Sequence, residues 1–196
     1  HTNDENKKGV VDDNVIPLND SRDQPELVAD EAALTQADEV SFEDNDLLAK
    51  GISEVRAIDP NFDKDEFLAG SRAAFELVLS AYSSGNTPSL KPLLSAEVFA
   101  NFAQVIWDRE QAKQTMEDTL VGITSAEIVE AFAESSVENI TVKFVSEQIN
   151  VIREENGKIV DGNPNAVVET IDFWTFSRNS KSSDPNWTLV ATNSLD

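Results

Sequence analysis

The sequence predicts an α+β domain in which N-terminal helices pack on a curved antiparallel sheet of about four strands. Apolar residues recur at helical spacing through the first half of the chain. After Thr119 this pattern gives way to alternation of apolar and polar residues with a period of two. Helices followed by a run of strands are typical of α+β proteins, whereas a parallel sheet would need helices between its strands.

Charge and composition exclude several classes of function. The 196 residues carry a formal net charge of -22, which repels nucleic-acid phosphates and anionic lipid headgroups. The chain has no cysteine, and its one histidine is His1. Disulfides, Cys- or His-ligated metal and Ser-His-Asp chemistry are therefore excluded. Without a glycine-rich phosphate loop or a calcium loop, we expect no cofactor and no nucleic-acid partner.

The N-terminal part divides into a linker and a helix. Residues 1–46 are acidic, and residues 1–34 contain no aromatic side chain, which predicts a disordered linker. A docking arm for a partner is the alternative. Residues 47–60 predict an amphipathic helix that stops at Asp59-Pro60. Its apolar face consists of Leu47, Leu48, Ile52, Val55 and Ile58.

Two longer helices follow within a core predicted over residues 62–192. Asp63 and Glu66 have the spacing of a capping pair at the start of the first helix. Gly85-Asn86 is expected to end that helix in a left-handed conformation. After the connector TPSLKPLLS, Ser95 is expected to cap a second helix that runs to about residue 115.

The C-terminal half is expected to form a meander. Residues 120–133 are rich in β-formers but have a helical character near 125–129. Residues 137–154 alternate well, so Ile140, Val142 and Phe144 should share one face. Glu155-Asn156-Gly157 predicts a tight hairpin. The runs AVVETIDFWTFSR and NWTLVAT predict two further strands.

Aromatic side chains gather in the last two strands. Phe173 should face away from Trp174 and Phe176, so only one of the two groups packs on the helices. Core packing is the simple interpretation, and the wall of an apolar pocket is the functional one. The predicted pocket residues are Phe75, Tyr82, Phe102, Trp107, Phe144, Trp174, Phe176 and Trp187.

Two arrangements of charged residues are candidates for chemistry. Glu147 and Glu169 lie on strands expected to be adjacent, and paired carboxylates can act in acid–base catalysis. In so acidic a chain, chance proximity is the better interpretation. Arg72 lies among small residues and is a candidate partner for a strand acid such as Asp172.

Four segments carry a resemblance to a known family. They are FLAGSRAAFELVLSAYSSGNTPSLKPLLSAEVFANF, VKFVSEQINVIRE, DFWTFSR and DPNWTLVAT. In order and spacing they resemble the C-terminal domain of the forty-four-kilodalton subunit of the mitochondrial presequence translocase, above all its bacterial homologues. The resemblance covers roughly residues 62–192, and residues 47–196 would form the whole domain.

The resemblance implies a non-enzymatic domain with a cone-like fold and an apolar pocket. It implies association with the bacterial inner membrane, through an anchor upstream of this chain. Partners would be inner-membrane lipid, translocase-type membrane proteins and unfolded polypeptide. The five apolar residues of the 47–60 helix are the expected membrane contact, although its many acids should weaken binding to anionic lipid. Chaperone recruitment is not carried over, because its segment has no match here.

Three functions therefore remain. The first is a membrane-associated domain that binds lipid or polypeptide in protein translocation or in organising an inner-membrane complex. The second is a small-ligand-binding or enzymatic cone-fold domain, which requires a buried carboxylate of raised pKa in a pocket. The third is a purely structural interaction module whose aromatic residues serve stability alone.

Overall fold

The computed structural model describes the backbone of residues 31–195 and the side chains of residues 43–195. The chain divides into two units, residues 1–38 and 39–196. The helices are α1 (Glu31–Ile58), α2 (Lys64–Ser84), α3 (Thr87–Leu90) and α4 (Ala96–Gln111), and the strands are β1 (Gln114–Glu134), β2 (Val137–Glu154), β3 (Ile159–Gly162), β4 (Val168–Asn179) and β5 (Thr188–Leu195). Helices followed by an antiparallel sheet confirm the predicted α+β class.

Helix α1 begins at Glu31, well before the start predicted at Leu47. The stretch EAALTQADE is rich in strong helix formers, a signal that a search for an apolar face does not detect. Residues 1–30 of the predicted linker lie outside the described residues. The helix ends at Ile58, directly before the Asp59-Pro60 pair that predicts its end.

Helices α2 and α4 begin at the predicted capping residues. The Asp63 carboxylate accepts a hydrogen bond of 2.8 Å from the N–H of Glu66, and the Ser95 hydroxyl accepts one of 3.3 Å from the N–H of Val98. Helix α2 is closed by Gly85, whose φ of 71° is in the left-handed region. Side chains and backbone thus fix both helices locally, as the sequence predicts.

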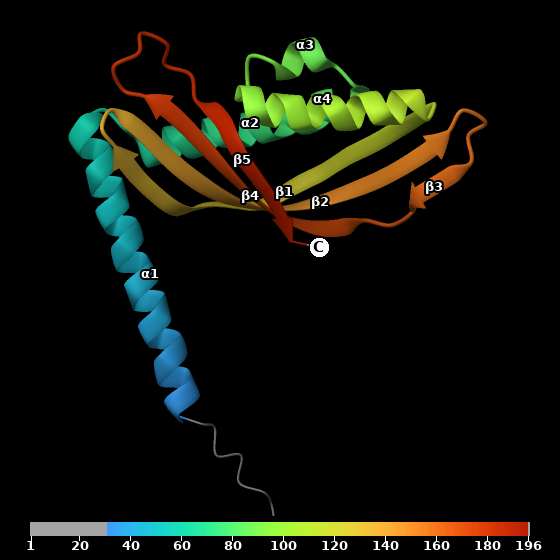
Figure 1. Cartoon of the computed structure of the whole chain (residues 1–196). Coiled ribbons are helices and arrows are strands. Elements are labelled where there is room, and N and C mark those ends of the chain that lie inside the picture. Colours follow the sequence, from blue (N-terminus) through green and yellow to red (C-terminus); the bar gives the residue numbers. More distant parts are fainter. Residues whose placement is uncertain (1–30, 196) are drawn as a thin grey trace, which may run out of the picture. The chain divides into compact units, whose positions relative to one another are not determined.

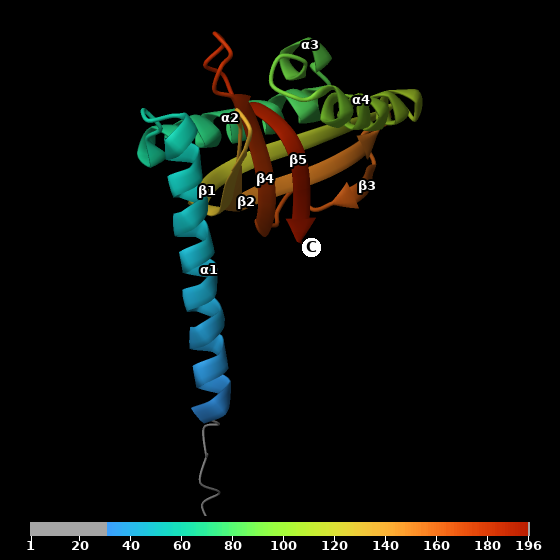
Figure 2. The same ribbon diagram turned by 60° about the vertical axis from the view of Figure 1, so that its left-hand side comes forward.

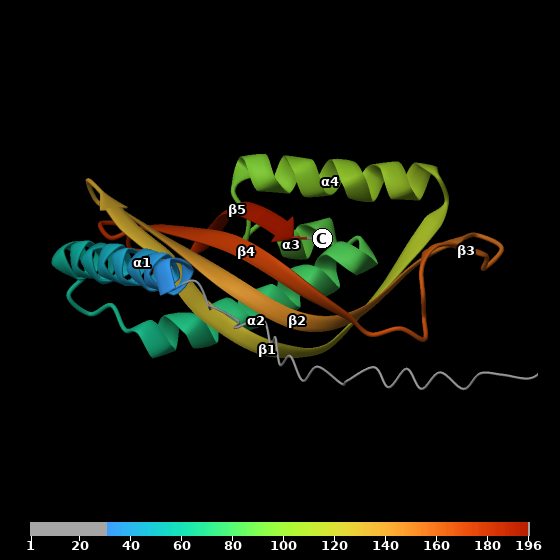
Figure 3. The same ribbon diagram turned by 90° about the horizontal axis from the view of Figure 1, so that it is seen from below.

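The sheet has the strand order β1-β2-β4-β5, and the short β3 pairs with the end of β2. All of these pairings are antiparallel. In Figures 1 and 2, α2, α3 and α4 lie on one side of the curved sheet. Figure 3 shows the strands from the opposite side. We call the side toward α2 and α4 the helix face and the opposite side the open face.

Strand β1 is longer than the sequence predicts, and it is β-strand along its whole length. It runs without a break from Gln114 to Glu134, so the predicted helical character at residues 125–129 is wrong. Its pairing with β2 shifts register between Leu120 and Gly122, and again at two later places. Each such bulge inserts one residue and interrupts the period of two, which makes the run irregular in the sequence.

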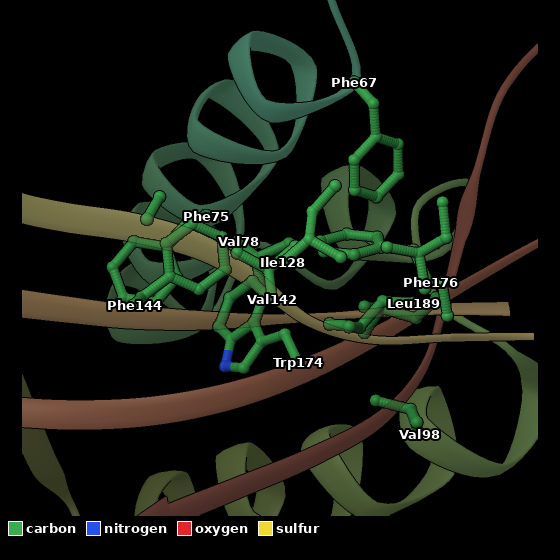
Figure 4. Packing of buried hydrophobic residues seen from close by; sticks show 14 of the residues in the cluster. Phe67, Phe75, Val78, Val98, Ile128, Val142, Phe144, Trp174, Phe176 and Leu189 are labelled. Carbon is green, nitrogen blue, oxygen red and sulfur yellow. The ribbon is translucent and has the colours of Figure 1, made fainter. Parts of the chain in front are cut away.

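The core lies between the helices and one end of the helix face, and α2 supplies the aromatic ring at its centre. Ile140, Val142 and Phe144 of β2 share this face, as predicted, and all three are fully buried. Phe75 of α2 packs on them, and Trp174 lies beside it on β4 (Figure 4). Alternation along β2 and β4 therefore explains why these side chains meet in one layer.

Candidate functional site

Four of the eight predicted pocket residues are core residues. Phe75 and Phe144 stack with ring centroids 4.4 Å apart, and Trp174 lies 4.6 Å from Phe75. Phe176 contacts Trp174 at 6.4 Å, and these four side chains are at most 3% exposed. Aromatic rings at these spacings fill the space between α2 and the sheet. Their buried area stabilises the fold.

Three of the other four predicted pocket residues are only partly buried and pack against the margin of this core. Trp187 packs on Phe67 at 4.8 Å, near the start of α2. Tyr82 and Phe102 join α2 to α4 with their rings 5.1 Å apart. Trp107 is 55% exposed on α4. The eight residues thus do not line one cavity together, and a ligand role for them stays a prediction.

The five predicted membrane-contact residues also divide. Leu47 is 65% exposed, whereas Ile52 and Val55 are buried in the core. Leu48 and Ile58 are half-buried. The apolar face of the helix therefore packs on its own domain along much of its length. A membrane contact through this face stays a prediction, with Leu47 as its accessible member.

A buried cluster of charges joins the end of α1 to the sheet. The Arg178 Nε of β4 donates to the Glu138 Oε2 of β2 at 2.8 Å, and its Nη2 donates to the Asp59 carboxylate. The guanidinium also lies 4.8 Å from the ring centre of Trp187. Among residues 43–195, the arginines that form ion pairs are Arg153 and Arg178, so the role expected of Arg72 belongs to Arg178.

The carboxylates of Glu147 and Glu169 are on paired positions of β2 and β4, as expected. Both residues are exposed, and they lie on the open face, since Glu147 alternates with the buried Ser146 and Gln148. Exposed carboxylates are not desolvated, so this pair lacks what acid–base catalysis requires. Chance proximity is the interpretation that the geometry supports.

The helix face turns polar beyond Phe144. Ser146 and Gln148 are at most 4% exposed, and the Gln148 Nε2 donates to the Ser146 Oγ at 2.9 Å. The Asn150 Nδ2 donates in turn to the Gln148 Oε1 at 3.3 Å. On neighbouring strands, the buried Asp172 carboxylate accepts from the Ser194 hydroxyl. We call this region the polar end: Asp118, Ser146, Gln148, Asn150, Thr170 and Asp172.

Three oxygens of the polar end are buried and have no hydrogen-bond partner within the described part of the chain. They are the Oδ1 of Asp118, the Oδ1 of Asn150 and the Oγ1 of Thr170. Burial raises the pKa of Asp118 from its ordinary 3.8 to about 6, and the neighbouring Asp172 charge adds to this shift. The polar end therefore holds a half-buried carboxylate of raised pKa, which is one of the two features that a cone-fold enzyme would need, the other being a pocket around it.

A groove lies between α1 and the edge strand β1. Its volume is about 720 Å³. Its apolar lining comes from Leu47, Leu48, Ile128, Val129 and Ala131, and its charged lining from Asp44, Lys50, Glu54, Glu127 and Glu130. One wall is held close by a glycine, because a Cβ at Gly51 would overlap the carbonyl oxygen of Ala131.

A second hollow of about 430 Å³ lies at the far end of the sheet. Lys113 and Glu155 line it and form an exposed ion pair of 3.2 Å, so its walls are polar and wet. Asp118 lines neither this hollow nor the groove.

Within the described part of the chain, no group of His, Cys, Asp and Glu side chains has the arrangement of a metal site. None of the described helices is long and apolar enough to cross a bilayer.

Sequence reasoning misses Arg178, Asp118 and the groove. Arg178 closely follows the aromatic run of β4, but only the fold brings Asp59 to it. Gly51, in the middle of an amphipathic helix, is the available signal for a close approach of another element. Nothing in the sequence distinguishes Asp118 from the other acids, since its environment comes from several strands.

Comparisons with known proteins give one consistent family. The Tim44-like domain matches residues 48–194. Mitochondrial import inner membrane translocase subunit TIM44-1 of Arabidopsis thaliana is 26% identical over 132 residues, which are 66% of this chain and 27% of that protein. Subunit TIM44 of Homo sapiens is 22% identical over 146 residues, 73% of this chain and 32% of that protein.

A solved structure is also similar. The intermembrane space region of the chloroplast protein ARC6 superimposes with a TM-score of 0.48 at 11% identity, over 69% of this chain and 98% of that one. The matched part of this chain spans less than a third of the length of each mitochondrial relative. The family match extends from α1 to the last strand. The chain belongs to the Tim44-like domain family.

Proposed function

We propose that this chain is a non-enzymatic, membrane-associated domain that binds polypeptide or lipid. It would act in protein translocation or in the organisation of an inner-membrane complex. Family membership supports this class of function, because the matched relatives are named as subunits of a mitochondrial inner membrane translocase. A bacterial inner membrane, an upstream anchor and translocase-type partners belong to the same proposal, on the resemblance of the four sequence segments.

The groove between α1 and β1 is the observation that carries the polypeptide part. Its apolar lining suits the side chains of an unfolded or amphipathic segment. Its charged lining has Asp44, Glu54, Glu127 and Glu130 against the single Lys50. This excess of carboxylates favours a segment with basic residues and disfavours an anionic lipid at the same place.

A binding assay with single substitutions tests the groove. The probe is a labelled amphipathic peptide of Leu, Ala and Arg, and its matched control carries Glu in place of Arg. Leu47→Gln changes an exposed groove residue and should weaken binding of the basic peptide by about tenfold. Leu77→Gln, on α2 outside the groove and 49% exposed, should leave it unchanged. Equal binding of both peptides would refute the proposal.

Vesicle flotation tests the lipid part. The chain is mixed with vesicles with and without cardiolipin, at low and at physiological salt. If Leu47 reaches the bilayer, Leu47→Gln should reduce flotation in every vesicle, since the apolar contact does not depend on salt. Absence of flotation for the unchanged chain would leave attachment to a protein partner or to an anchor.

A small-ligand site is the second candidate, and Asp118 is the observation that favours it. Buried oxygens without donors suit a ligand rich in N–H groups, for which spermidine is a simple probe. Spermidine should raise the melting temperature of the unchanged chain but not that of Asp118→Asn. No shift in either protein would remove this candidate. The remaining alternative, a purely structural module, agrees with the packing of Phe75 and Phe144.

A further inference from the structure

The buried residues of α1 cannot pack in the core and contact a membrane at the same time. Ile52 is 6% exposed and Val55 is 0% exposed, because both pack in the core of the domain. The same two residues belong to the face predicted to meet a membrane. A lipid contact through them therefore requires residues 43–58 of α1 to leave the sheet.

Few contacts hold this part of α1. Residues 43–47 are exposed, as are Ala49 and Lys50. The attachment includes the backbone contact of Gly51 with Ala131 and the ion pair just past the helix end at Asp59. Its apolar part consists of the buried Ile52 and Val55 and the half-buried Leu48, which packs against the core. A short attachment of this kind can open locally while the sheet stays folded.

Asp59 can leave its ion pair with Arg178 at little electrostatic cost. Arg178 is shared between two carboxylates, those of Asp59 and Glu138. Glu138 has a fully buried side chain, whereas the side chains of Asp59 and Arg178 are 18% and 19% exposed. When Asp59 departs, Arg178 and Glu138 still form a pair with no net charge. No buried charge is therefore left without a counterion.

Departure of Asp59 also relieves repulsion inside the cluster. Burial raises the pKa of Glu138, the bond and charge of Arg178 oppose this, and the Asp59 charge raises it further. Asp59 and Glu138 thus repel each other across the guanidinium. Removing Arg178 would have the opposite consequence, because it would leave the buried Glu138 without a counterion.

We propose that the Asp59–Arg178 ion pair is a release latch for the C-terminal part of α1, which acts as a strap on β1. With the latch closed, the strap forms the groove wall. With it open, Leu48, Ile52 and Val55 become available to a lipid surface. The latch rests on the cluster geometry alone, and its use at a membrane rests on the proposed function.

Hydrogen exchange of the full chain tests the latch through Asp59→Asn. This substitution keeps the local turn, because the Oδ1 of residue 59 can still accept from the N–H of Asn61, as it does now at 3.2 Å. Amides of residues 51–58 should then exchange about tenfold faster, while amides of β2 and β4 keep their rates. Asp65→Asn, an exposed acid of α2 without an ion pair among residues 43–195, removes the same charge and should change neither.

Vesicle flotation of the same three proteins separates the latch from the proposed function. Faster exchange with stronger flotation in Asp59→Asn alone supports both. Faster exchange without flotation supports the latch and overturns the lipid contact. Unchanged exchange at residues 51–58, or an equal increase throughout β2, overturns the latch, since Asp59 would then contribute nothing there or would stabilise the whole fold.

Discussion

The two ends of the helix face are built from the same strands with opposite chemistry. At one end, Ile140, Val142 and Phe144 of β2 are sealed by the aromatic rings of α2 and β4. At the polar end, the same alternation on β2 buries Ser146 and Gln148. Strand geometry therefore decides which side chains are buried, and residue type decides whether burial stabilises the fold or strains it.

The difference has a functional meaning. The apolar end carries the attachments of α1 and the groove, so its stability sets whether the proposed binding surface exists. The polar end holds three buried oxygens that have no donor among the described residues and a carboxylate of raised pKa, and these groups cost stability. Proteins retain such costly groups where a ligand or a proton is used, or where they are tolerated near water.

The largest effect is expected at the apolar end. Phe144→Ala removes a fully buried ring that stacks on Phe75, and it should lower the free energy of unfolding by about 3–5 kcal/mol. Ser146→Ala, two residues along the same face, should cost only about 1–2 kcal/mol through its bond to Gln148. Urea titrations measure both. Equal costs would mean that the two ends do not differ in packing.

The next largest effect on stability is expected from substituting Gly51, with Gly70 as the control. Gly51→Ala drives a Cβ into the carbonyl oxygen of Ala131, and it should cost about 1–3 kcal/mol as α1 is pushed from β1. Gly70→Ala is the matched control within a helix, because a Cβ there meets nothing. It should stabilise the protein by about 0.5–1 kcal/mol. Urea titrations of both variants measure the difference. A stabilising Gly51→Ala would contradict the close approach that forms the groove wall.

At the polar end the effect depends on pH. The folded pKa of Asp118 is raised to about 6, above the ordinary 3.8, so protonation favours the folded state. The stability that this group contributes is complete below about pH 4 and is lost as pH rises through about 6. Asp118→Asn should therefore stabilise the protein at pH 8. Because the side chain is half-buried and water screens its charge, the gain should be about 1 kcal/mol, less than the full shift would give.

The control for this prediction is the same comparison at pH 4, where Asp118 is largely protonated and the substitution should change the melting temperature little. Glu97→Gln, an exposed acid of α4, should have no such pH dependence. If Asp118→Asn stabilised the protein equally at both pH values, the cost of Asp118 to stability would come from the shape of its side chain and not from its charge.

Local signals predict the helices better than the sheet. The caps at Asp63 and Ser95 and the left-handed Gly85 act over a few residues, so the sequence contains all of their physics. Strand β1 resembles a helix at residues 125–129 because its bulges are defined only by pairing with β2. Patterns that need a partner strand are invisible in one segment.

Contacts between distant segments also determine the parts of the site that the sequence does not reveal. Composition is enough to find the aromatic residues, but whether they fill a core or line a cavity depends on how closely α2 approaches the sheet. Arg72 attracts attention over Arg178 because it lies among small residues. Arg178, and not Arg72, forms the ion pairs because Asp59 and Glu138 lie beside it. Both acids are distant from Arg178 in sequence and contact it only in the fold.

The smallest effect is expected on the open face. Glu147 and Glu169 are directly opposed like charges, but both are exposed to water. Replacing both by Gln removes their repulsion and should stabilise the protein by no more than about 0.5 kcal/mol, with less effect at high salt. Urea titrations at two salt concentrations measure this. A loss of stability, or of peptide binding at the distant groove, would mean that the pair is not a chance neighbour. The open face around this pair would then join the groove as part of the functional surface.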